Sequence, residues 1–229
     1  MKWHLALGTP ANKLKFKDHD NLAHYANAAT DIQFEFPFGF KELEGIHSRT
    51  DFDLKSHQEL SGKKLTYFDQ EKNEAYVPYV VETSIGADRM FLAMLSNNLK
   101  EESVPDSKGE DSTRLVFKIH PALAPVKCAV LPLVKNKEEL TSKAKTIYDK
   151  LKLQFQCQYD DKDAIGRRYR RQDAIGTPIC ITVDFETLDD NCVTVRDRDT
   201  LVQQRVPIEK LSAIIAEKTD MSKVLDQLV

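Results

Sequence analysis

The sequence of 229 residues has room for one or two domains. Hydrophobic residues make up 41% of the chain and charged residues 30%, a balance typical of a packed core and not of a disordered chain. The net charge of −3 gives no general attraction to nucleic acids or anionic membranes, so binding of that kind would need a local basic patch.

The first half of the chain predicts antiparallel strands and one helix. A helix is expected from residue 86 to 98, and the charged segment 40–54 favours an antiparallel hairpin. Residues 100–113 are polar and contain Pro and Gly, so we expect a linker or loop there. Alternating or short apolar stretches are expected to form strands at 31–40, 64–68, 75–81 and 115–119.

In the second half, strands alternate with helices, which predicts an α/β domain with a mixed, roughly five-stranded sheet. Strands are expected at 126–134, 154–159, 178–185, 191–196 and 200–206. Helices are expected at 138–153, at 165–173 and from Pro207 onwards, with a break near Asp220. The expected fold class is therefore α/β (α+β overall), with two domains, 1–119 and 120–229.

The stretch VETSIGADR joins the end of an expected strand to the start of an expected helix. Arg89 would lie in the first helical turn, where a cation opposes the helix dipole. A bound phosphate would compensate it, and so would a surface ion pair with Asp or Glu, and the spacing leaves both open. Glu82 and Ser84 would share one face of the strand, and Gly86 permits a close backbone approach or a positive φ.

The stretch IGRRYRRQDAIGTP gathers four arginines around one tyrosine. Guanidinium groups beside an aromatic ring suit phosphate contacts and base stacking. The alternative is a solvated helix face whose arginines pair with Asp161, Asp163 and Asp173. The run from Arg196 to Asp199 alternates in sign and is typical of a turn held by ion pairs.

No metal site is expected. The carboxylates and histidines between residues 42 and 57 show no H-x-H or H-E-x-x-H pattern, so a charged hairpin is favoured there. The four cysteines are widely spaced without a C-x-x-C pair, which argues against a structural zinc and fits a reducing cytoplasm. Cys128 and Cys180 lie in apolar runs and are expected in the core. No apolar run reaches the roughly 20 residues of a membrane span.

Together these stretches resemble one enzyme family. PYVVETSIGADRMFLAML resembles motif 3 of class II aminoacyl-tRNA synthetases, and ELEGIHSRTDFDLKSH resembles the segment of glycyl-tRNA synthetases just before it. HPALAPVKCAVLPLV, AIGRRYRRQDAIGTPICITVDF and VTVRDRDTLVQQRV are similar to the C-terminal anticodon-binding domain of that enzyme. The resemblance is to the bacterial type and covers nearly the whole chain. It implies part of an antiparallel catalytic sheet in 1–119 and an anticodon-binding domain in 120–229.

The resemblance implies a role for each motif. Arg89 matches the motif 3 arginine that contacts an ATP phosphate, which makes it the expected catalytic residue. The implied ATP-binding residues are Glu42, Leu43, Gly86, Ala87, Asp88 and Arg89. The implied glycine-binding residues are Glu82, Thr83, Ser84, Ile85 and Gly86. Glu82 would hold the amino group and Ser84 would keep the pocket small, with Arg49 or Glu44 as further lining residues. The expected tRNA-binding residues are Arg167, Arg168, Tyr169, Arg170 and Arg171.

Neither motif 1 nor motif 2 of the family is found in the sequence. We therefore expect part of a ligase that joins glycine to tRNA(Gly) with ATP and Mg²⁺, in a cytoplasmic homodimeric enzyme with no membrane attachment. Because half of the phosphate clamp is missing, this chain alone is expected to be inactive. The alternatives are a stand-alone tRNA- or RNA-binding module formed by residues 120–229, and a small-molecule kinase or ligase that uses the GADR turn.

Overall fold

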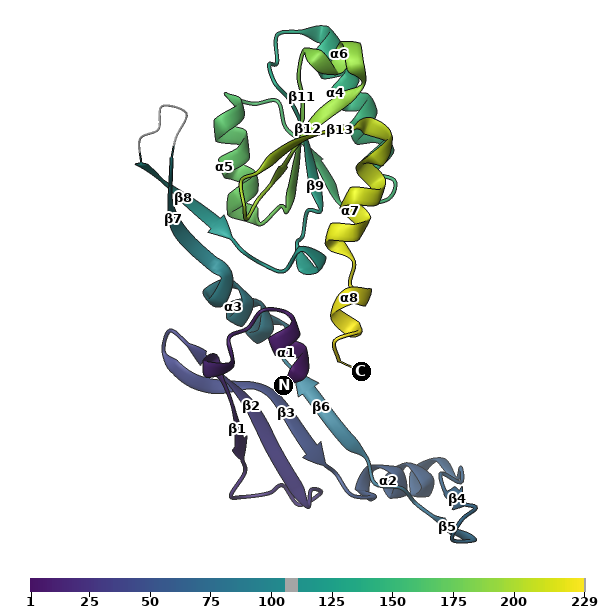
Figure 1. The fold of residues 1–229 in the computed structure, drawn as a ribbon. Coiled ribbons are helices and arrows are strands. Elements are labelled where there is room, and N and C mark those ends of the chain that lie inside the picture. The colour runs from purple at the N-terminus through teal and green to yellow at the C-terminus, as the bar shows by residue number, and fades with distance from the viewer. Residues whose placement is uncertain (106–110, 229) are drawn as a thin grey trace. The chain divides into compact units, whose positions relative to one another are not determined.

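The computed structural model describes residues 1–105 and 111–228 (Figure 1). The chain divides into two compact units, which are described separately. The first unit comprises residues 1–5 and 9–96, and the second comprises residues 6–8 and 97–229. Among the described residues, no helix is both long and apolar enough to cross a membrane.

The first unit is built on a four-stranded antiparallel sheet with the strand order β1-β2-β3-β6. A two-stranded ribbon of β4 and β5 stands apart from this sheet. The elements of the first unit are α1 (Lys2–Ala6), a 3₁₀ turn (Ala11–Lys13), β1 (Leu14–Asp18), β2 (Ala28–Phe36), β3 (Gly39–Ser48), α2 (Phe52–Ser61), β4 (Tyr67–Asp69), β5 (Glu74–Tyr76), β6 (Val81–Ile85) and α3 (Ala87–Asn98). The expected antiparallel sheet and the helix after Gly86 are confirmed.

The sheet of the first unit has an apolar face and a polar face because side chains alternate along each strand. The apolar face packs on α3 through Leu14, Ile32, Phe34, Phe36, Leu43 and Ala93. A bulge between Ile32 and Gln33 leaves Leu43 without a direct partner across the sheet. On the other face, Asp31 pairs in register with Gly45, and Gly45 with Ser84. This polar face therefore gathers short, charged and hydroxyl side chains.

Two expectations for the first unit are wrong in detail. Segment 40–54 is not a hairpin, because it combines the second half of a hairpin, β3, with the start of α2. α2 buries none of its residues, so no apolar stripe marks it in the sequence. The strand expected at 75–81 is divided between β5 and β6 around Pro78, which has no N–H to donate to a sheet.

The second unit contains the expected mixed sheet, with the strand order β10-β9-β11-β12-β13. β9, β10 and β11 are parallel, whereas β12 and β13 are antiparallel to their neighbours. The strands are β7 (Leu99–Pro105), β8 (Asp111–Phe117), β9 (Cys128–Pro132), β10 (Cys157–Tyr159), β11 (Ile179–Val183), β12 (Cys192–Asp197) and β13 (Gln203–Pro207). The helices are α4 (Glu138–Leu151), α5 (Ile165–Ile175), α6 (Glu186–Asp190), α7 (Leu211–Thr219) and α8 (Ser222–Leu225), with 3₁₀ turns at Pro121–Leu123 and Ile208–Lys210.

Helices cover both faces of this sheet, as Figure 1 shows for α5 on one side and α4 with α7 on the other. The central strands β9 and β11 are buried at every position, which explains their continuous apolar sequences. Cys128, Val130 and Ile181 pack toward α4 and α7, whereas Ala129, Leu131 and Cys180 pack toward α5. Cys128 and Cys180 are therefore core residues, as expected.

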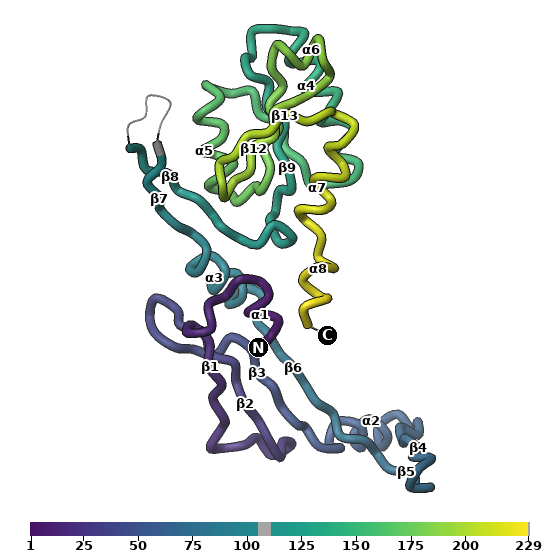
Figure 2. Tube along the Cα trace, in the orientation of Figure 1, coloured from purple at the N-terminus to yellow at the C-terminus, as the bar shows by residue number. Residues whose placement is uncertain are grey.

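The loop expected at 100–113 is largely a hairpin. β7 and β8 pair from Leu99 opposite Phe117 to Pro105 opposite Asp111, while residues 106–110 lie outside the described part (Figure 2). The sequence of this hairpin does not look like strands, because polar residues pair with each other across it. Arg114 pairs with Glu102, with Nη2 and Oε2 at 2.7 Å. Since β8 packs on α5, the second unit begins near residue 97, whereas the sequence places a domain boundary at 119/120.

Asp173 of α5 is the electrostatic centre of the second unit. Its side chain is fully buried, and both carboxylate oxygens accept hydrogen bonds from Arg196 of β12 at 2.8 and 2.9 Å. Arg114 of β8 donates to the same carboxylate at 3.1 Å. One carboxylate therefore joins α5 to the five-stranded sheet and to the β7–β8 hairpin.

Gly176 closes α5 where no other residue fits. Its φ of +84° lies in the left-handed region, and a Cβ there would lie 2.9 Å from the backbone oxygen of Phe117. Its own carbonyl oxygen accepts a hydrogen bond from Arg198 at 2.8 Å. The end of α5 is thus held against β8 by close backbone contact.

We predict that Asp173→Asn lowers the free energy of unfolding by about 3–5 kcal/mol, because it leaves the buried guanidinium of Arg196 without its counter-charge and removes one of the two carboxylates that pair with Arg114. The matched control is Asp163→Asn, whose partly exposed side chain pairs only with surface arginines and whose positive φ Asn tolerates. This control should cost under about 1 kcal/mol. Urea denaturation followed by circular dichroism measures both, and equal losses would contradict a central role for Asp173.

Candidate functional site

The first candidate site lies where β6 leads into α3. Arg89 is in the first turn of α3, and its Nη1 donates to the backbone oxygen of Glu42 at 2.9 Å. The carboxylate of Glu42 lies 3.5 Å from the same nitrogen, and both side chains are about half exposed, at 49% and 52%. The structure therefore brings together two of the predicted ATP-binding residues that are far apart in sequence. It also supplies the neighbouring carboxylate that the sequence left open as a partner for Arg89.

Glu82 on β6 faces Arg49, which follows β3. Arg49 Nη1 donates to Glu82 Oε2 at 2.6 Å, and Arg49 Nε donates to Asp53 Oδ2 at 2.6 Å. The guanidinium also lies 4.1 Å from the ring centre of Tyr25. The hydrogen bonds to Asp53 and Glu82 raise the pKa of Arg49, and Arg49 holds the pKa of Asp53 below its usual range. Glu82 thus has one side-chain oxygen engaged by Arg49.

The predicted glycine-binding stretch divides between the two faces of β6. Glu82 and Ser84 pair with His47 and Gly45 of β3 and lie on the polar face, whereas alternation puts Thr83 and Ile85 on the other face. Thr83 and Ile85 can therefore contribute only backbone groups to a small pocket around Glu82 and Ser84.

Two further residues of the first site differ from simple expectation. Gly86 does not take a positive φ, so of its two expected uses only a close backbone approach remains. The side chain of Leu43 is 2% exposed and packs in the apolar core, so only its backbone could reach a nucleotide. Ala87 and Asp88 are exposed in the first turn of α3, where the carboxylate of Asp88 is favourable to the helix dipole.

The second candidate site is the arginine-rich helix α5, and its arginines have different roles. Arg168 is 1% exposed, and its two terminal nitrogens donate to the backbone oxygens of Pro132 and Leu133 at the end of β9. Burial lowers its pKa. In this fold Arg168 supports the β9 end and offers no surface to a phosphate.

Tyr169 is also occupied by the protein itself. Its hydroxyl lies 2.5 Å from Oγ1 of Thr182, and its ring lies under the guanidinium of Arg196 at 4.7 Å. Burial raises the pKa of this phenol. Its ring face is therefore not available to stack on a nucleotide base in this arrangement.

Of the remaining three arginines of α5, Arg167 and Arg171 are exposed and Arg170 is half-buried. Arg171 is held by Asp160 and Asp163, each with an oxygen at 2.8 Å, and Arg170 donates to Ser112 of β8 at 3.0 Å. The side chain of Arg167 is 78% exposed, with a carboxylate oxygen of Asp163 only at 3.9 Å. Of the five residues predicted to bind tRNA, Arg167 is thus the most available to a polyanion.

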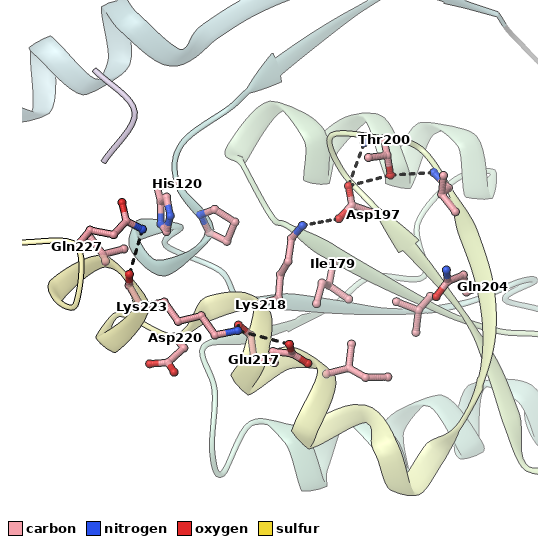
Figure 3. A pocket seen from close by; sticks show the side chains of 15 residues that line it. His120, Ile179, Asp197, Thr200, Gln204, Glu217, Lys218, Asp220, Lys223 and Gln227 are labelled. Atoms are coloured by element: carbon pink, nitrogen blue, oxygen red, sulfur yellow. Dashed lines mark hydrogen bonds and ion pairs between the residues drawn. The ribbon is translucent and has the colours of Figure 1, made fainter. Parts of the chain in front are cut away.

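A hollow that the sequence does not indicate lies beside α7 and α8 (Figure 3). It has a volume of about 750 Å³, with Ile179, Val195 and Ile214 among its apolar lining residues. Four of the charged groups that line it are paired, since Lys218 lies 2.7 Å from Asp197 and Lys223 lies 3.4 Å from Glu217. Burial alone would raise the pKa of Asp197, but the bond to Lys218 and backbone hydrogen bonds lower it to about 2.

The chain is similar to known proteins in sequence and in fold. Residues 127–218, which span β9 to α7, match the family model described as an anticodon binding domain. One solved structure, the RNA binding domain of threonyl-tRNA synthetase from Cryptosporidium parvum, matches with a TM-score of 0.60 and 17% identity. That match covers 86% of this chain and 44% of that chain, and at such identity it bears on the fold alone.

Curated relatives are far closer in sequence. The chain is 51% identical over 218 residues to the glycine–tRNA ligase of Agathobacter rectalis, which is 94% of this chain and 46% of the relative. It is 53% identical over 212 residues to the glycine–tRNA ligase of Chlorobaculum tepidum, which is 93% of this chain and 44% of the relative. The chain thus spans about half the length of these relatives. The resemblance expected from its motifs is confirmed, since the chain is similar to glycine–tRNA ligases over nearly all of its own length.

Proposed function

We propose that this chain is part of a glycine–tRNA ligase, in which residues 97–228 contribute anticodon recognition and the β6–α3 turn contributes to the site for glycine and ATP. The observation that carries the proposal is the identity of 51–53% to such ligases across more than nine-tenths of the chain. The match of residues 127–218 to an anticodon binding domain supports the first role.

The geometry at the start of α3 supports the ATP-binding role. The ion pair between Arg89 and Glu42 is half exposed and loose, and such pairs contribute about 0–1 kcal/mol. A polyphosphate with Mg²⁺ can therefore compete with Glu42 for the guanidinium, and the helix N-terminus favours an anion at the same place. In this proposal Arg89 is the catalytic residue, and Gly86, Ala87 and Asp88 approach the nucleotide through their backbone.

The polar face of β6 supports a role in binding glycine. Glu82 has one carboxylate oxygen engaged by Arg49. Its other oxygen has no hydrogen-bond partner among the described residues and can accept from an ammonium group. Ser84 lies two residues along the same face, where its hydroxyl can border a small pocket. A pocket of this kind selects glycine by excluding larger side chains.

The partners, cofactors and location form part of the same proposal. tRNA(Gly), glycine and ATP with Mg²⁺ would be the substrates, the complete enzyme would be a homodimer, and the site of action would be the cytoplasm. The alternative of a stand-alone RNA-binding module is favoured by one observation, namely that the family model matches only within residues 127–218. Assays of pyrophosphate exchange and of tRNA binding distinguish a part of a ligase from a stand-alone RNA-binding module.

We predict that a polypeptide of these 229 residues does not catalyse glycine-dependent exchange of pyrophosphate into ATP. The reason is that its sequence contains no segment resembling motif 2, whose arginine would grip the α-phosphate opposite Arg89. The measurement is isotope exchange with and without glycine, with a complete ligase of the same family as the positive control. Glycine-dependent exchange above background would show that the site is complete.

We predict that Arg167→Glu weakens binding of tRNA(Gly) and reduces the slope of log affinity against log salt by about 1, because one phosphate contact is lost. The control is Lys150→Glu, an equal charge reversal at an exposed position of α4, on the opposite face of the sheet. Filter binding at several salt concentrations measures both variants. An unchanged slope for the first variant, or an equal loss for the second, would contradict a tRNA-binding face on α5.

We further predict that tRNA(Gly) with an altered anticodon binds the chain more weakly than unaltered tRNA(Gly), because base contacts specify while phosphate contacts only position. The same filter-binding assay at one salt concentration measures the ratio of affinities. Equal affinities would reject anticodon recognition and would favour the general RNA-binding module.

A further inference from the structure

Two histidines and one aspartate meet on the sheet of the first unit. His19 directly follows β1, Asp31 lies in β2, and His47 lies near the end of β3. One ligand atom from each residue lies within 4.8 Å of the other two. In the described part of the chain, this is the one group of three or more His, Cys, Asp or Glu side chains that approach so closely.

Strand pairing explains why residues so far apart in sequence come together. The backbone N–H of His19 donates to the oxygen of Ala29 at 3.1 Å, and Ala29 lies opposite His47 in the β2–β3 register. Asp31 follows two positions after Ala29 and therefore points to the same face of the sheet. Three adjacent strands thus present the three side chains side by side.

One ring nitrogen of each histidine is buried without a hydrogen-bond partner in the described part of the chain. Nε2 of His19 lies 2.8 Å from Oδ1 of Asp31, but the approach lacks the alignment of a hydrogen bond. This nitrogen and Nδ1 of His47 are both shielded from solvent, and neither makes a hydrogen bond within the described residues. A buried polar atom without a partner costs free energy, and two such nitrogens beside one carboxylate can be satisfied together by a bound water or ion.

Gly45 keeps space open beside the three side chains. It lies opposite Asp31 in the register, and a Cβ built on it would lie 3.3 Å from Cε1 of His47 and 3.7 Å from Oδ1 of Asp31. Any other residue here would fill the room between the imidazole and the carboxylate. The open space therefore coincides with the unpartnered nitrogens.

We propose that His19, Asp31 and His47 form a binding site for a divalent transition-metal ion, with zinc as the best fit. Two imidazoles and one carboxylate are a donor set that zinc prefers, whereas Mg²⁺ and Ca²⁺ prefer oxygen ligands alone. Three protein ligands leave a fourth position for water, as in open zinc sites. The ligand atoms need to move to about 2.0–2.2 Å from the ion. Rotation of the His19 ring, whose side chain is 32% exposed, can supply that movement.

The site depends only on the sheet of the first unit, so it can be tested separately from the proposed ligase function. The site nevertheless lies close to the proposed glycine-binding residues, because His47 lies directly opposite Glu82 in the β3–β6 register. The sequence predicts no metal here, since the three ligands lie on separate strands and form no short motif.

The first experiment measures zinc binding to the untagged 229-residue chain by competition with a chromophoric chelator, with a thiol-free reductant present. We expect one zinc ion per chain. His19→Ala, Asp31→Asn and His47→Ala should each weaken binding at least about 10-fold, the lower range seen when even outer-shell partners are lost. The control, His57→Ala, removes an exposed histidine of α2 outside the cluster and should bind zinc as the unaltered chain does.

The second experiment uses the unaltered chain with cobalt in place of zinc, so that it does not depend on any variant folding. Visible d–d absorption without a sulfur-to-cobalt charge-transfer band would support nitrogen and oxygen ligands. A sulfur band would assign the metal to the free cysteines and overturn the proposal. The proposal is also overturned if the unaltered chain binds no zinc, or if the cluster variants that keep the native circular dichroism spectrum bind it as tightly as His57→Ala does.

Discussion

The fully buried carboxylate of Asp173 is the interaction on which the second unit depends. A buried charge is tolerated only when it is paired and hydrogen-bonded, and Asp173 meets this requirement through Arg196 and Arg114. The pairing joins three segments from different parts of the chain, namely β8, α5 and β12. Because the guanidinium of Arg196 also covers the ring of Tyr169, the same interaction fixes the orientation of α5 against the sheet. The β7–β8 hairpin is held to this unit by the same carboxylate.

This constraint decides which basic residues remain for a ligand. An arginine-rich segment in an acidic chain suggests a polyanion-binding patch, yet Arg168 donates to backbone oxygens at the end of β9. Arg198 likewise donates within its own unit, to the backbone oxygen of Gly176 and to the carboxylate of Asp199. Guanidinium groups suit this use because their several donors can satisfy carbonyl oxygens at strand and helix ends. On α5 the exposed arginines that remain are Arg167 and Arg171, of which Arg167 is the more exposed, at 78% against 42%. Recognition of tRNA through α5 would therefore rest on a few phosphate contacts and not on a continuous basic stripe.

Parts of the fold were predictable where the sequence pattern has one physical cause. β9 and β11 are covered on both faces, so their apolar runs could hardly arise otherwise. The pattern failed where polar residues pair with each other. Glu102 and Arg114 make β7 and β8 look like a loop, and α2 has no buried stripe to reveal it. The roles of Arg168 and Tyr169 were equally hidden, since composition cannot say whether a guanidinium faces solvent or a strand end. The three residues of the candidate metal site come together only through strand register, which no spacing rule describes.

On the polar face of the first unit, Arg49 fixes the orientation of the side chains around it. Arg49 donates to Glu82 and Asp53 and lies against Tyr25, so four groups in contact fix one another before any ligand binds. Because Asp53 and Tyr25 hold the guanidinium, its hydrogen bond to one oxygen of Glu82 fixes the orientation of that carboxylate. A carboxylate held in this way loses little conformational freedom when an ammonium group binds, which favours binding of a ligand as small as glycine. The two candidate sites of this chain therefore differ. In the first unit the charged side chains are arranged around the partly exposed carboxylate of Glu82, whereas in the second unit most arginines of the site bond to other groups of the same unit.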